Sequence, residues 1–390
     1  MGGLRARLDY ILKHNYFFNR VFLKTVSFGF RFLGLFIPVD KKMIIFSGHS
    51  RRYNDSPKAL YEYLLKNREI YGSFKCIWAL EDIKQSKKIP GNPIIVKTDT
   101  FKYFIYTLRA KYWVTCVNIE RGLDYKKKSC RYLNTWHGIP LKAVGNDAGG
   151  RQDYDFKSIN YFCYSGEYEK TIYQRAFKVK SESLIPVGLP RNDSLYQTSK
   201  EDIIKIKEKL CIPLDKKVIL YAPTWRDSND GGKSCQLAPP INPIKWSSEL
   251  SDAYVVLFRM HAYTNKLIGI EFNDTLRDFS EYPDINDLFK VSDILISDYS
   301  ASIVDFSILE RPIICFAYDY YEYKRDRGLY LDFVTHMPSG IINNENELLA
   351  YIKGMDYQRE CEKTRTMIKA KLLEYGGNAT KKCAELLLKD

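Results

Sequence analysis

The chain has 390 residues, of which 45% are hydrophobic, 14% aromatic and 27% charged. This length suffices for two ordinary domains, and the composition excludes collagen-like, low-complexity and largely disordered proteins. Sixty Lys and Arg residues against 47 Asp and Glu residues leave a formal net charge of +13, which favours an anionic partner: nucleic acid, an acidic membrane surface or a phosphorylated substrate.

Residues 1–40 combine basic side chains with many aromatic ones, which predicts an amphipathic helical segment that lies on a membrane surface. A membrane span needs roughly 20 uninterrupted apolar residues, and Lys24 and Arg31 interrupt the most apolar stretch here. We therefore predict peripheral attachment to an anionic membrane, at its cytoplasmic face. The alternative is that these residues pack on the protein's own body.

From residue 41 to residue 200, short apolar runs rich in β-branched residues alternate with helical stretches. This alternation is typical of a parallel sheet covered by helices, and it predicts a first Rossmann-like domain. The expected strands are 43–46, 74–79, 93–96, 112–116, 131–135, 161–164 and 184–187, and the expected helices are 57–66, 101–109 and 167–177.

Residues 201–390 repeat this alternation after a polar, charged stretch, which predicts a second α/β domain. Its expected strands are 218–222, 254–259, 293–297 and 312–316. Residues 344–389 carry two or three helical segments, and the last of these could return to the first domain. Two such domains are expected to face a central cleft, because open parallel sheets bind ligands at the carboxyl ends of their strands.

The nine cysteines are scattered, odd in number and contain no C-x-x-C pair, which is typical of reduced thiols in the cytosol. The five histidines, at positions 14, 49, 137, 261 and 336, are isolated from one another and from the cysteines. A zinc site needs clustered ligands, so we predict neither a structural metal nor a metal-dependent reaction, and no cofactor.

His137 follows an expected strand and precedes a turn that contains Gly138 and Pro140. Proline suits the first turn of a helix, so the chain is expected to turn directly after the histidine. A histidine near its ordinary pKa is the natural general base for deprotonating a hydroxyl group at neutral pH. His137 is therefore a candidate catalytic base, and the alternative is that it only caps the turn.

Arg259 and His261 end a strand of the second domain, on the same side of the extended backbone. Such a pair suits a diphosphate: arginine can bind phosphate oxygens with two hydrogen bonds, and His261 can neutralise or protonate the leaving phosphate. The alternative is that both side chains are simply solvated.

Two further strand ends carry hydroxyl and charged groups. Ser297, Asp298, Ser300 and Ser302 lie between a strand and an expected helix at 303–310, where serine hydroxyls and backbone N–H groups can form an anion site. Thr224 and Arg226 close another strand and would suit a nucleotide. An N-cap explains one of the serines, and an ordinary loop junction is the alternative for Thr224 and Arg226.

The chain contains no P-loop and no G-x-G-x-x-G after any expected strand, which removes the main support for an NTPase or a dehydrogenase. It also lacks a D-x-D pair at a strand end where a metal would bind a nucleotide diphosphate. What remains is a metal-independent transferase with two domains.

In its ordered motifs the chain resembles the CDP-glycerol glycerophosphotransferase family of teichoic acid and capsule biosynthesis, over roughly residues 42–380. The motifs that carry the resemblance are YNDSPKALYEYL at 53–64, WHGIPLK at 136–142, YAPTWRD at 221–227, RMH at 259–261, YPD at 282–284, SDYS at 297–300 with Asp305, RP at 311–312 and YD at 318–319. Ile139 and Ala301 stand where family members commonly have threonine and serine.

This resemblance implies a GT-B fold, with acceptor binding by the first domain and CDP-polyol binding by the second. It implies that His137 is the catalytic base. It further implies that the diphosphate and polyol are surrounded by Arg259, His261, Ser297, Asp298, Ser300 and Ser302. For Thr224 and Arg226 the resemblance gives weaker support for a role in substrate binding. The implied reaction transfers glycerol phosphate from CDP-glycerol to a hydroxyl of an undecaprenyl-linked saccharide or growing polymer, and releases CMP. The alternatives are a CDP-ribitol donor, a UDP-sugar glycosyltransferase, and a basic scaffold without catalysis; nucleic acid is not expected as a partner.

Overall fold

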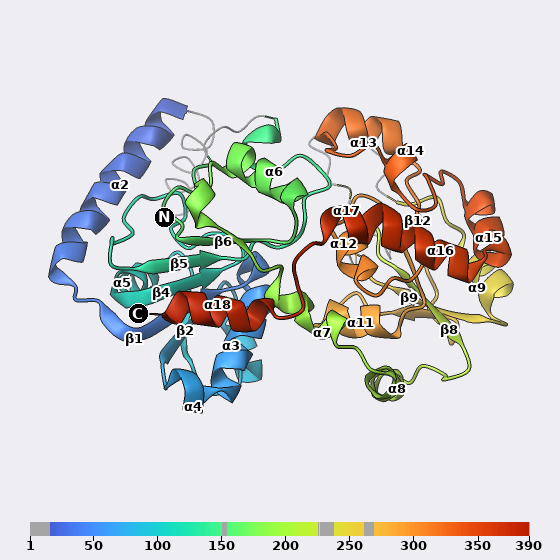
Figure 1. Ribbon diagram of the computed structural model, residues 1–390, viewed down its shortest axis with the longest axis horizontal. Helices are drawn as coiled ribbons and strands as arrows, with labels where there is room; N and C mark the ends of the chain where they lie inside the picture. Colours follow the sequence, from blue (N-terminus) through green and yellow to red (C-terminus); the bar gives the residue numbers. More distant parts are fainter. Residues whose placement is uncertain (1–15, 150–153, 225, 227–237, 261–268, 390) are drawn as a thin grey trace. The chain divides into compact units, whose positions relative to one another are not determined.

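The computed structural model describes residues 16–149, 154–224, 226, 238–260 and 269–389. Their contacts divide the chain into two compact units (Figure 1). Unit 1 comprises residues 1–137, 157–163 and 380–390, and unit 2 comprises residues 138–156 and 164–379. The chain thus passes from unit 1 into unit 2 directly after His137, and each unit is described by itself.

A seven-stranded sheet with the order β3-β2-β1-β4-β5-β6-β7 is built almost entirely from unit 1. The neighbouring strands β1 and β2, β2 and β3, β1 and β4, β4 and β5, and β5 and β6 are parallel. Its central strands are buried as continuous apolar runs, as expected for a parallel sheet with both faces covered. The strands are β1 (Asp40–Ser47), β2 (Lys75–Leu80), β3 (Ile94–Lys97), β4 (Ala110–Thr115), β5 (Arg131–Asn134), β6 (Tyr161–Tyr164) and β7 (Leu184–Pro186).

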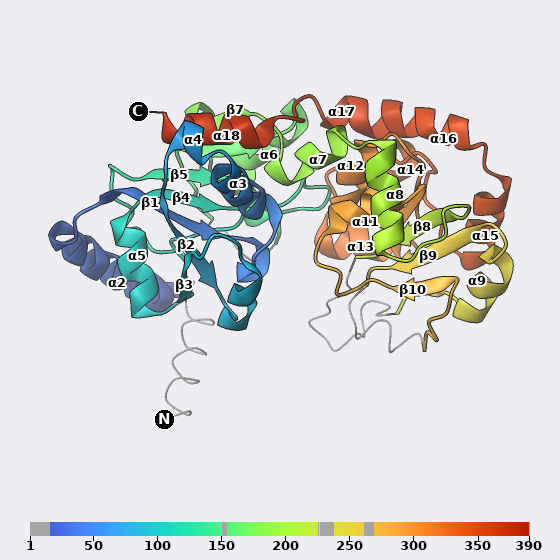
Figure 2. The same cartoon turned by 90° about the horizontal axis from the view of Figure 1, so that it is seen from below.

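Helices cover this sheet within unit 1. They are α2 (Tyr16–Phe36), α3 (Asp55–Lys66), α4 (Arg68–Tyr71), α5 (Phe101–Arg109) and α18 (Ala379–Leu388), with 3-10 turns at His49–Arg51 and Ile83–Lys88. Helix α2 lies beside α5, which Figures 1 and 2 both show, and the rings of Phe30 and Phe104 lie 4.6 Å apart. The predicted return of the last helix is confirmed: the Arg131 guanidinium donates to the Leu387 carbonyl at 3.1 Å.

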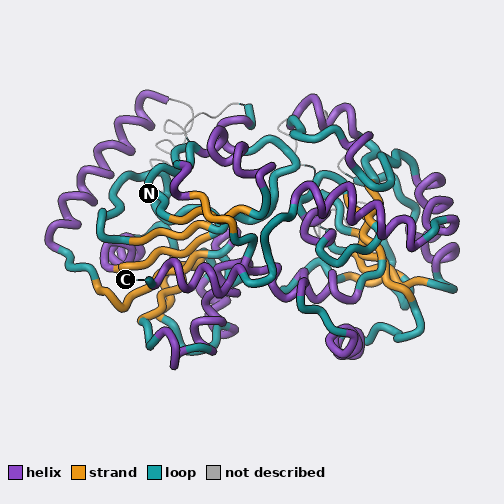
Figure 3. Tube along the Cα trace, in the orientation of Figure 1, coloured by secondary structure: helices purple, strands orange, loops and turns teal. Residues whose placement is uncertain are grey.

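Unit 2 contains a five-stranded parallel sheet with the order β10-β9-β8-β11-β12. Its strands are β8 (Lys217–Tyr221), β9 (Tyr254–Phe258), β10 (Leu276–Asp278), β11 (Ile294–Ser297) and β12 (Ile313–Cys315). Figure 3 shows the strands of each sheet in orange among purple helices. The sequence prediction missed β10, because this edge strand has three residues and two of them are charged.

The helices of unit 2 include α8 (Lys200–Lys209), which the polar stretch forms because Ser199 and Asp202 make a reciprocal capping box. The others are α6 (Glu167–Phe177), α7 (Asp193–Tyr196), α9 (Pro243–Leu250), α11 (Ile285–Val291), α12 (Ser302–Ser307), α13 (Tyr320–Arg327), α14 (Phe333–His336), α15 (Glu345–Gly354), α16 (Tyr357–Thr364) and α17 (Ala370–Leu372). A π-helical turn at Arg365–Lys369 joins the last two, and 3-10 turns lie at Gly145–Asp147, Ser181–Ser183 and Pro190–Asn192.

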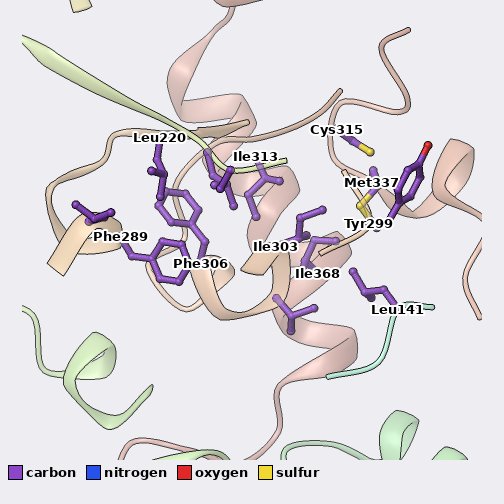
Figure 4. Close-up of a cluster of buried hydrophobic side chains, with 14 of the residues drawn as sticks. Leu141, Leu220, Phe289, Tyr299, Ile303, Phe306, Ile313, Cys315, Met337 and Ile368 are labelled. Carbon is purple, nitrogen blue, oxygen red and sulfur yellow. The ribbon is translucent and has the colours of Figure 1, made fainter. Parts of the chain in front are cut away.

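The core of unit 2 lies on both faces of its sheet. Val218 and Leu220 of β8 belong to one buried cluster, and Ile219 and Tyr221 belong to another, because successive side chains of a strand point to opposite faces. Figure 4 shows the first cluster, which includes Leu141. The segment that directly follows His137 is thus anchored in the core of unit 2.

Candidate active site

His137 follows β5 at the carboxyl edge of the first sheet. Its Nδ1 atom lies 2.7 Å from the Cys116 carbonyl oxygen, which follows the neighbouring strand β4. A carbonyl oxygen only accepts hydrogen bonds, so Nδ1 carries the proton and donates it. In the neutral imidazole the lone pair is then on Nε2, which is the arrangement that a general base requires.

A second histidine lies against His137. The ring centroids of His49 and His137 are 4.8 Å apart, and the His49 side chain is exposed. The sequence interpretation assigned no role to His49. The sequence did contain an indication of such a role. His49 follows a buried strand by two residues, and polar side chains that contact ligands commonly lie at this carboxyl edge of a parallel sheet.

Arg226 forms the centre of an ionic network in unit 2. Its guanidinium is 2% exposed and lies between two carboxylates, with 2.6 Å from Nε to Asp319 and 2.9 Å from Nη1 to Asp298. Burial would by itself lower the pKa of Arg226, but Asp298 and Asp319 raise it above its ordinary value. The guanidinium also lies 5.0–5.2 Å from the ring centroids of Tyr299, Tyr318 and Tyr323.

Asp298 joins this network to the neighbouring loops. One of its oxygens accepts hydrogen bonds from the backbone N–H groups of Thr224, at 2.8 Å, and Tyr299, at 2.6 Å. Ser297 donates its hydroxyl to the Ala222 carbonyl at 2.7 Å. Arg226 and Asp298 therefore lie together, and Arg226, Ser297 and Asp298 each make internal contacts that hold the loops after β8 and β11.

The more accessible hydroxyl groups of this region belong to Ser300 and Ser302. Both side chains are half-buried, and the Ser300 hydroxyl donates to that of Ser302 at 2.9 Å. The Thr224 hydroxyl oxygen is buried and has no hydrogen-bond partner among the described residues. Helix α12 begins at Ser302, one residue earlier than expected.

Arg259 directly follows β9, which ends one residue earlier than predicted, and its guanidinium is half-buried. Nη1 donates to the carbonyl oxygens of Tyr282, at 2.6 Å, and Phe279, at 3.3 Å. Burial lowers the pKa of Arg259 from its ordinary value, against the opposing effect of Asp284. His261 lies outside the described residues.

Lys142 is a cation to which the sequence interpretation gave no role, although it belongs to the motif at 136–142. It follows Gly138 in unit 2, and its ammonium forms no ion pair with any described residue. Burial lowers the pKa of Lys142, and Asp298 opposes this effect.

Gly138, which directly follows His137, lies close to the loop after β11. It has φ +146, and a Cβ there would lie 2.6 Å from the Ala301 methyl group, so this close approach requires glycine.

Within the described ranges, no three His, Cys, Asp or Glu side chains gather as they would around a metal ion. The same residues contain no helix that is long and apolar enough to cross a membrane.

Comparison of the sequence with known protein families identifies the family of this chain. The sequence model of the CDP-glycerol:poly(glycerophosphate) glycerophosphotransferases matches residues 30–389. The chain belongs to this family. The predicted resemblance is thereby confirmed, and with it the prediction that the chain is an enzyme of the glycerophosphotransferase class.

Two relatives cover most of this glycerophosphotransferase-family chain. The teichoic acid glycerol-phosphate transferase of Staphylococcus aureus is 37% identical over 341 residues, which are 81% of this chain and 85% of the relative. The teichoic acid poly(glycerol phosphate) polymerase of Bacillus spizizenii is 32% identical over 394 residues, which are 95% and 98% of the two chains.

A solved structure of the wall teichoic acid polymerase TagF matches the fold with a TM-score of 0.77 and 30% identity, over 90% of each chain. Another structure of that polymerase includes CDPG. The predicted α/β fold of GT-B type, with two Rossmann-like sheets, is confirmed by this match and by the two parallel sheets.

Proposed function

We propose that this protein transfers glycerol phosphate from CDP-glycerol to a hydroxyl group of a lipid-linked saccharide or growing polymer, and releases CMP. The observation that carries the proposal is the hydrogen bond from Nδ1 of His137 to the Cys116 carbonyl, which leaves Nε2 as the base in a chain of this family. The alternatives are transfer of ribitol phosphate from CDP-ribitol and sugar transfer from a UDP-sugar.

In the proposed reaction, Nε2 of His137 takes the proton of the acceptor hydroxyl. The acceptor oxygen forms a bond to the phosphorus that bears glycerol, and the bond from that phosphorus to the CMP oxygen breaks. Such a transfer depends on positioning and on neutralising charge rather than on covalent catalysis. The proposed cations that neutralise the charge of the diphosphate are Lys142, Arg259 and His261. The proposed donors of hydroxyl hydrogen bonds are Thr224, Ser300 and Ser302. Arg226, Ser297 and Asp298 are proposed to hold these groups in place.

The donor is tested by incubating the protein with an acceptor and each of CDP-glycerol, CDP-ribitol and UDP-sugars, and by measuring released CMP and UDP. We expect CMP release with CDP-glycerol, accompanied by one glycerol phosphate added to the acceptor for each CMP. Turnover with CDP-ribitol alone would show that the donor is CDP-ribitol instead of CDP-glycerol. Turnover with a UDP-sugar alone would refute the proposed reaction.

For the acceptor side, we propose that α2 attaches the protein to an anionic membrane at the cytoplasmic face. Seven large apolar side chains of this helix are exposed, with Phe28 at 70% and Leu35 at 79%. At 100° per residue they share one arc of about 140°. They are Phe18, Val21, Phe22, Phe28, Phe32, Leu35 and Phe36.

The opposite face of α2 packs on unit 1. Ser27 is 3% exposed and accepts a hydrogen bond from the Asp124 backbone, and Phe30 contacts Phe104 and Tyr125. The two interpretations of this segment are therefore compatible: one face belongs to the protein's body, and the other supports membrane attachment. Arg20, Lys24 and Arg31 lie between the two faces, where they would meet anionic headgroups.

Substitution of the exposed face tests this attachment. The triple variant F28S/F32S/L35S is expected to bind anionic vesicles at least about a hundredfold more weakly, because each apolar side chain contributes about 1–2 kcal/mol on burial. Ile70→Ser, which removes an exposed apolar side chain from α4, is the matched control and should bind as the unsubstituted chain does. Vesicle cosedimentation measures the effect. Equal binding by the triple variant would show that this face does not enter the membrane.

A further inference from the structure

His49 and His137 form a pair of imidazole rings at the carboxyl edge of the first sheet. Their centroids are 4.8 Å apart, and the planes of the two rings meet at 39°. His49 follows β1 and His137 follows β5, and β4 lies between these two strands in the sheet. Both residues belong to unit 1. The proposed reaction uses only His137, and it leaves the second ring without a role.

The turn that carries His49 is held in a defined conformation. The Arg51 N–H donates to the Gly48 carbonyl at 3.1 Å, and one residue later the Arg52 N–H donates to the carbonyl of the histidine at 3.2 Å. A Cβ at Gly48 would lie 2.2 Å from the Arg52 carbonyl oxygen, so this turn requires glycine. The Arg51 guanidinium donates to the Asn118 side chain at 2.9 Å, which fastens the turn to the segment after β4. The fold therefore fixes the position of His49 beside the proposed base.

The two rings differ in their exposure to water. His49 is exposed, whereas His137 is half-buried and its ring lies 4.1 Å from that of the buried Trp136, centroid to centroid. Burial disfavours the charged form of an imidazole, because the imidazolium loses part of its hydration. The hydrogen bond from Nδ1 of His137 to the Cys116 carbonyl is present in both protonation states of that ring. The exposed ring of His49 is therefore expected to take up the first proton of the pair.

A proton on His49 opposes a second proton on His137. Two unit charges about 5 Å apart repel each other by the equivalent of roughly 0.5–2 pH units, between the dielectric constant of water and that of a protein surface. Two groups that interact this strongly titrate as a pair, in two separate steps. Since a general base must be unprotonated, such a neighbour extends the pH range over which His137 can act.

Other charged groups lie on the segments around this pair within unit 1. Arg51 is half-buried, and burial is the largest cause of its lowered pKa. Asp99 is held by Arg121 at 2.6 Å, and burial raises the pKa of Glu120, which favours its uncharged form. All these groups are present in every variant described below, so a comparison of the variants isolates the effect of His49. The charged and titratable side chains on these segments are Arg51, Arg52, Tyr53, Asp55, Lys58, Glu81, Asp99, Tyr103, Cys116, Glu120, Arg121 and Tyr132.

We propose that His49 accepts a proton before His137 does, and that the resulting charge keeps the proposed base unprotonated at mildly acidic pH. The inference rests on the proposed function, and it identifies a residue that sets the pH range of the reaction. His49 acts through His137 rather than on the substrate, so it is a positioning residue. Transfer should continue at a pH at which an isolated histidine would already be protonated.

NMR titration of the full chain tests this order of protonation and needs no substrate. The chain has five histidines, so isotope-labelled histidine gives few imidazole signals, and single variants assign them. We expect His49 to titrate at the higher pH of the two. In His49→Gln the titration midpoint of His137 should rise by about 0.5–2 pH units, because the repelling charge is gone. His336→Gln, which removes a histidine from α14, is the matched control and should leave this midpoint unchanged.

A second variant separates the charge of His49 from the packing of its ring. His49→Lys keeps a positive charge on the same turn but removes the imidazole. The midpoint of His137 should then stay at or below its value in the unsubstituted chain. A midpoint raised as far as in His49→Gln would overturn the inference, as would a His137 that titrates at the higher pH of the pair. Both substitutions change an exposed side chain, so thermal unfolding should find both variants folded.

Kinetics connect this inference to the proposed function. Below the midpoint of the base, kcat/KM for CMP release falls about tenfold per pH unit, so the shifted midpoint should make His49→Gln about 3- to 100-fold slower there. At about pH 8, where both rings are neutral, kcat should agree within about twofold. An equal loss of activity at every pH would indicate a structural role and would overturn the inference. Absence of CMP release with every donor would refute the proposed function, while the NMR midpoints would still decide the order of protonation.

Discussion

Replacement of His137 by alanine is expected to lower kcat for glycerol phosphate transfer by about 10²–10⁴, the usual contribution of a general base. The reason is the tautomer fixed by the Cys116 carbonyl, which leaves Nε2 as the proton acceptor. Binding of CDP-glycerol should change little, because the proposed donor ligands Ser300, Ser302 and Arg259 all belong to unit 2. Rapid-quench kinetics and calorimetry measure the two quantities separately.

His336→Ala is the matched control for this substitution. His336 also donates from Nδ1 to a backbone carbonyl, that of Asp332 at 2.8 Å, but it lies on α14 and outside every proposed contact. Its replacement should leave kcat within about twofold. Turnover by His137→Ala at the rate of the unsubstituted protein would make His137 a structural residue and would require another base.

Replacement of Arg226 by methionine is expected to destabilise unit 2 by about 3–5 kcal/mol, because it leaves the carboxylates of Asp298 and Asp319 buried without a counter-ion. The loops after β8 and β11 would also lose one of the contacts that join them, so KM for CDP-glycerol should rise in any variant that remains folded. Urea unfolding measures the first effect, and CMP release measures the second.

Two companion variants give this prediction its controls. Arg325→Met removes an exposed arginine that pairs with Asp326 at 2.8 Å, and it should change the free energy of unfolding by less than about 1 kcal/mol. The double variant R226M/D319N also removes the charge of Asp319, one of the two carboxylates that Arg226→Met leaves without a counter-ion. It should therefore recover part of the lost stability. Equal unfolding of Arg226→Met and Arg325→Met would contradict the structural role assigned to the network.

Local sequence determined most of the secondary structure. Helices 101–109 and 167–177 have the predicted limits, since Thr100 caps the first and the apolar periodicity extends over both. The strands are recognisable because a parallel strand covered on both faces is a continuous apolar run. The motifs also predicted that His137 and Arg259 lie at strand ends, and both follow a strand closely, β5 and β9 respectively.

The partners of these residues came only from the tertiary structure. Arg226 meets Asp319 from 93 positions away, and Arg51 meets Asn118 from 67 positions away. No periodicity encodes such pairs, because they depend on the strand order β1-β4-β5 in one sheet and β8-β11-β12 in the other. For this reason the sequence identified Arg226 as a cation near a nucleotide, whereas the fold shows that two buried carboxylates neutralise its charge.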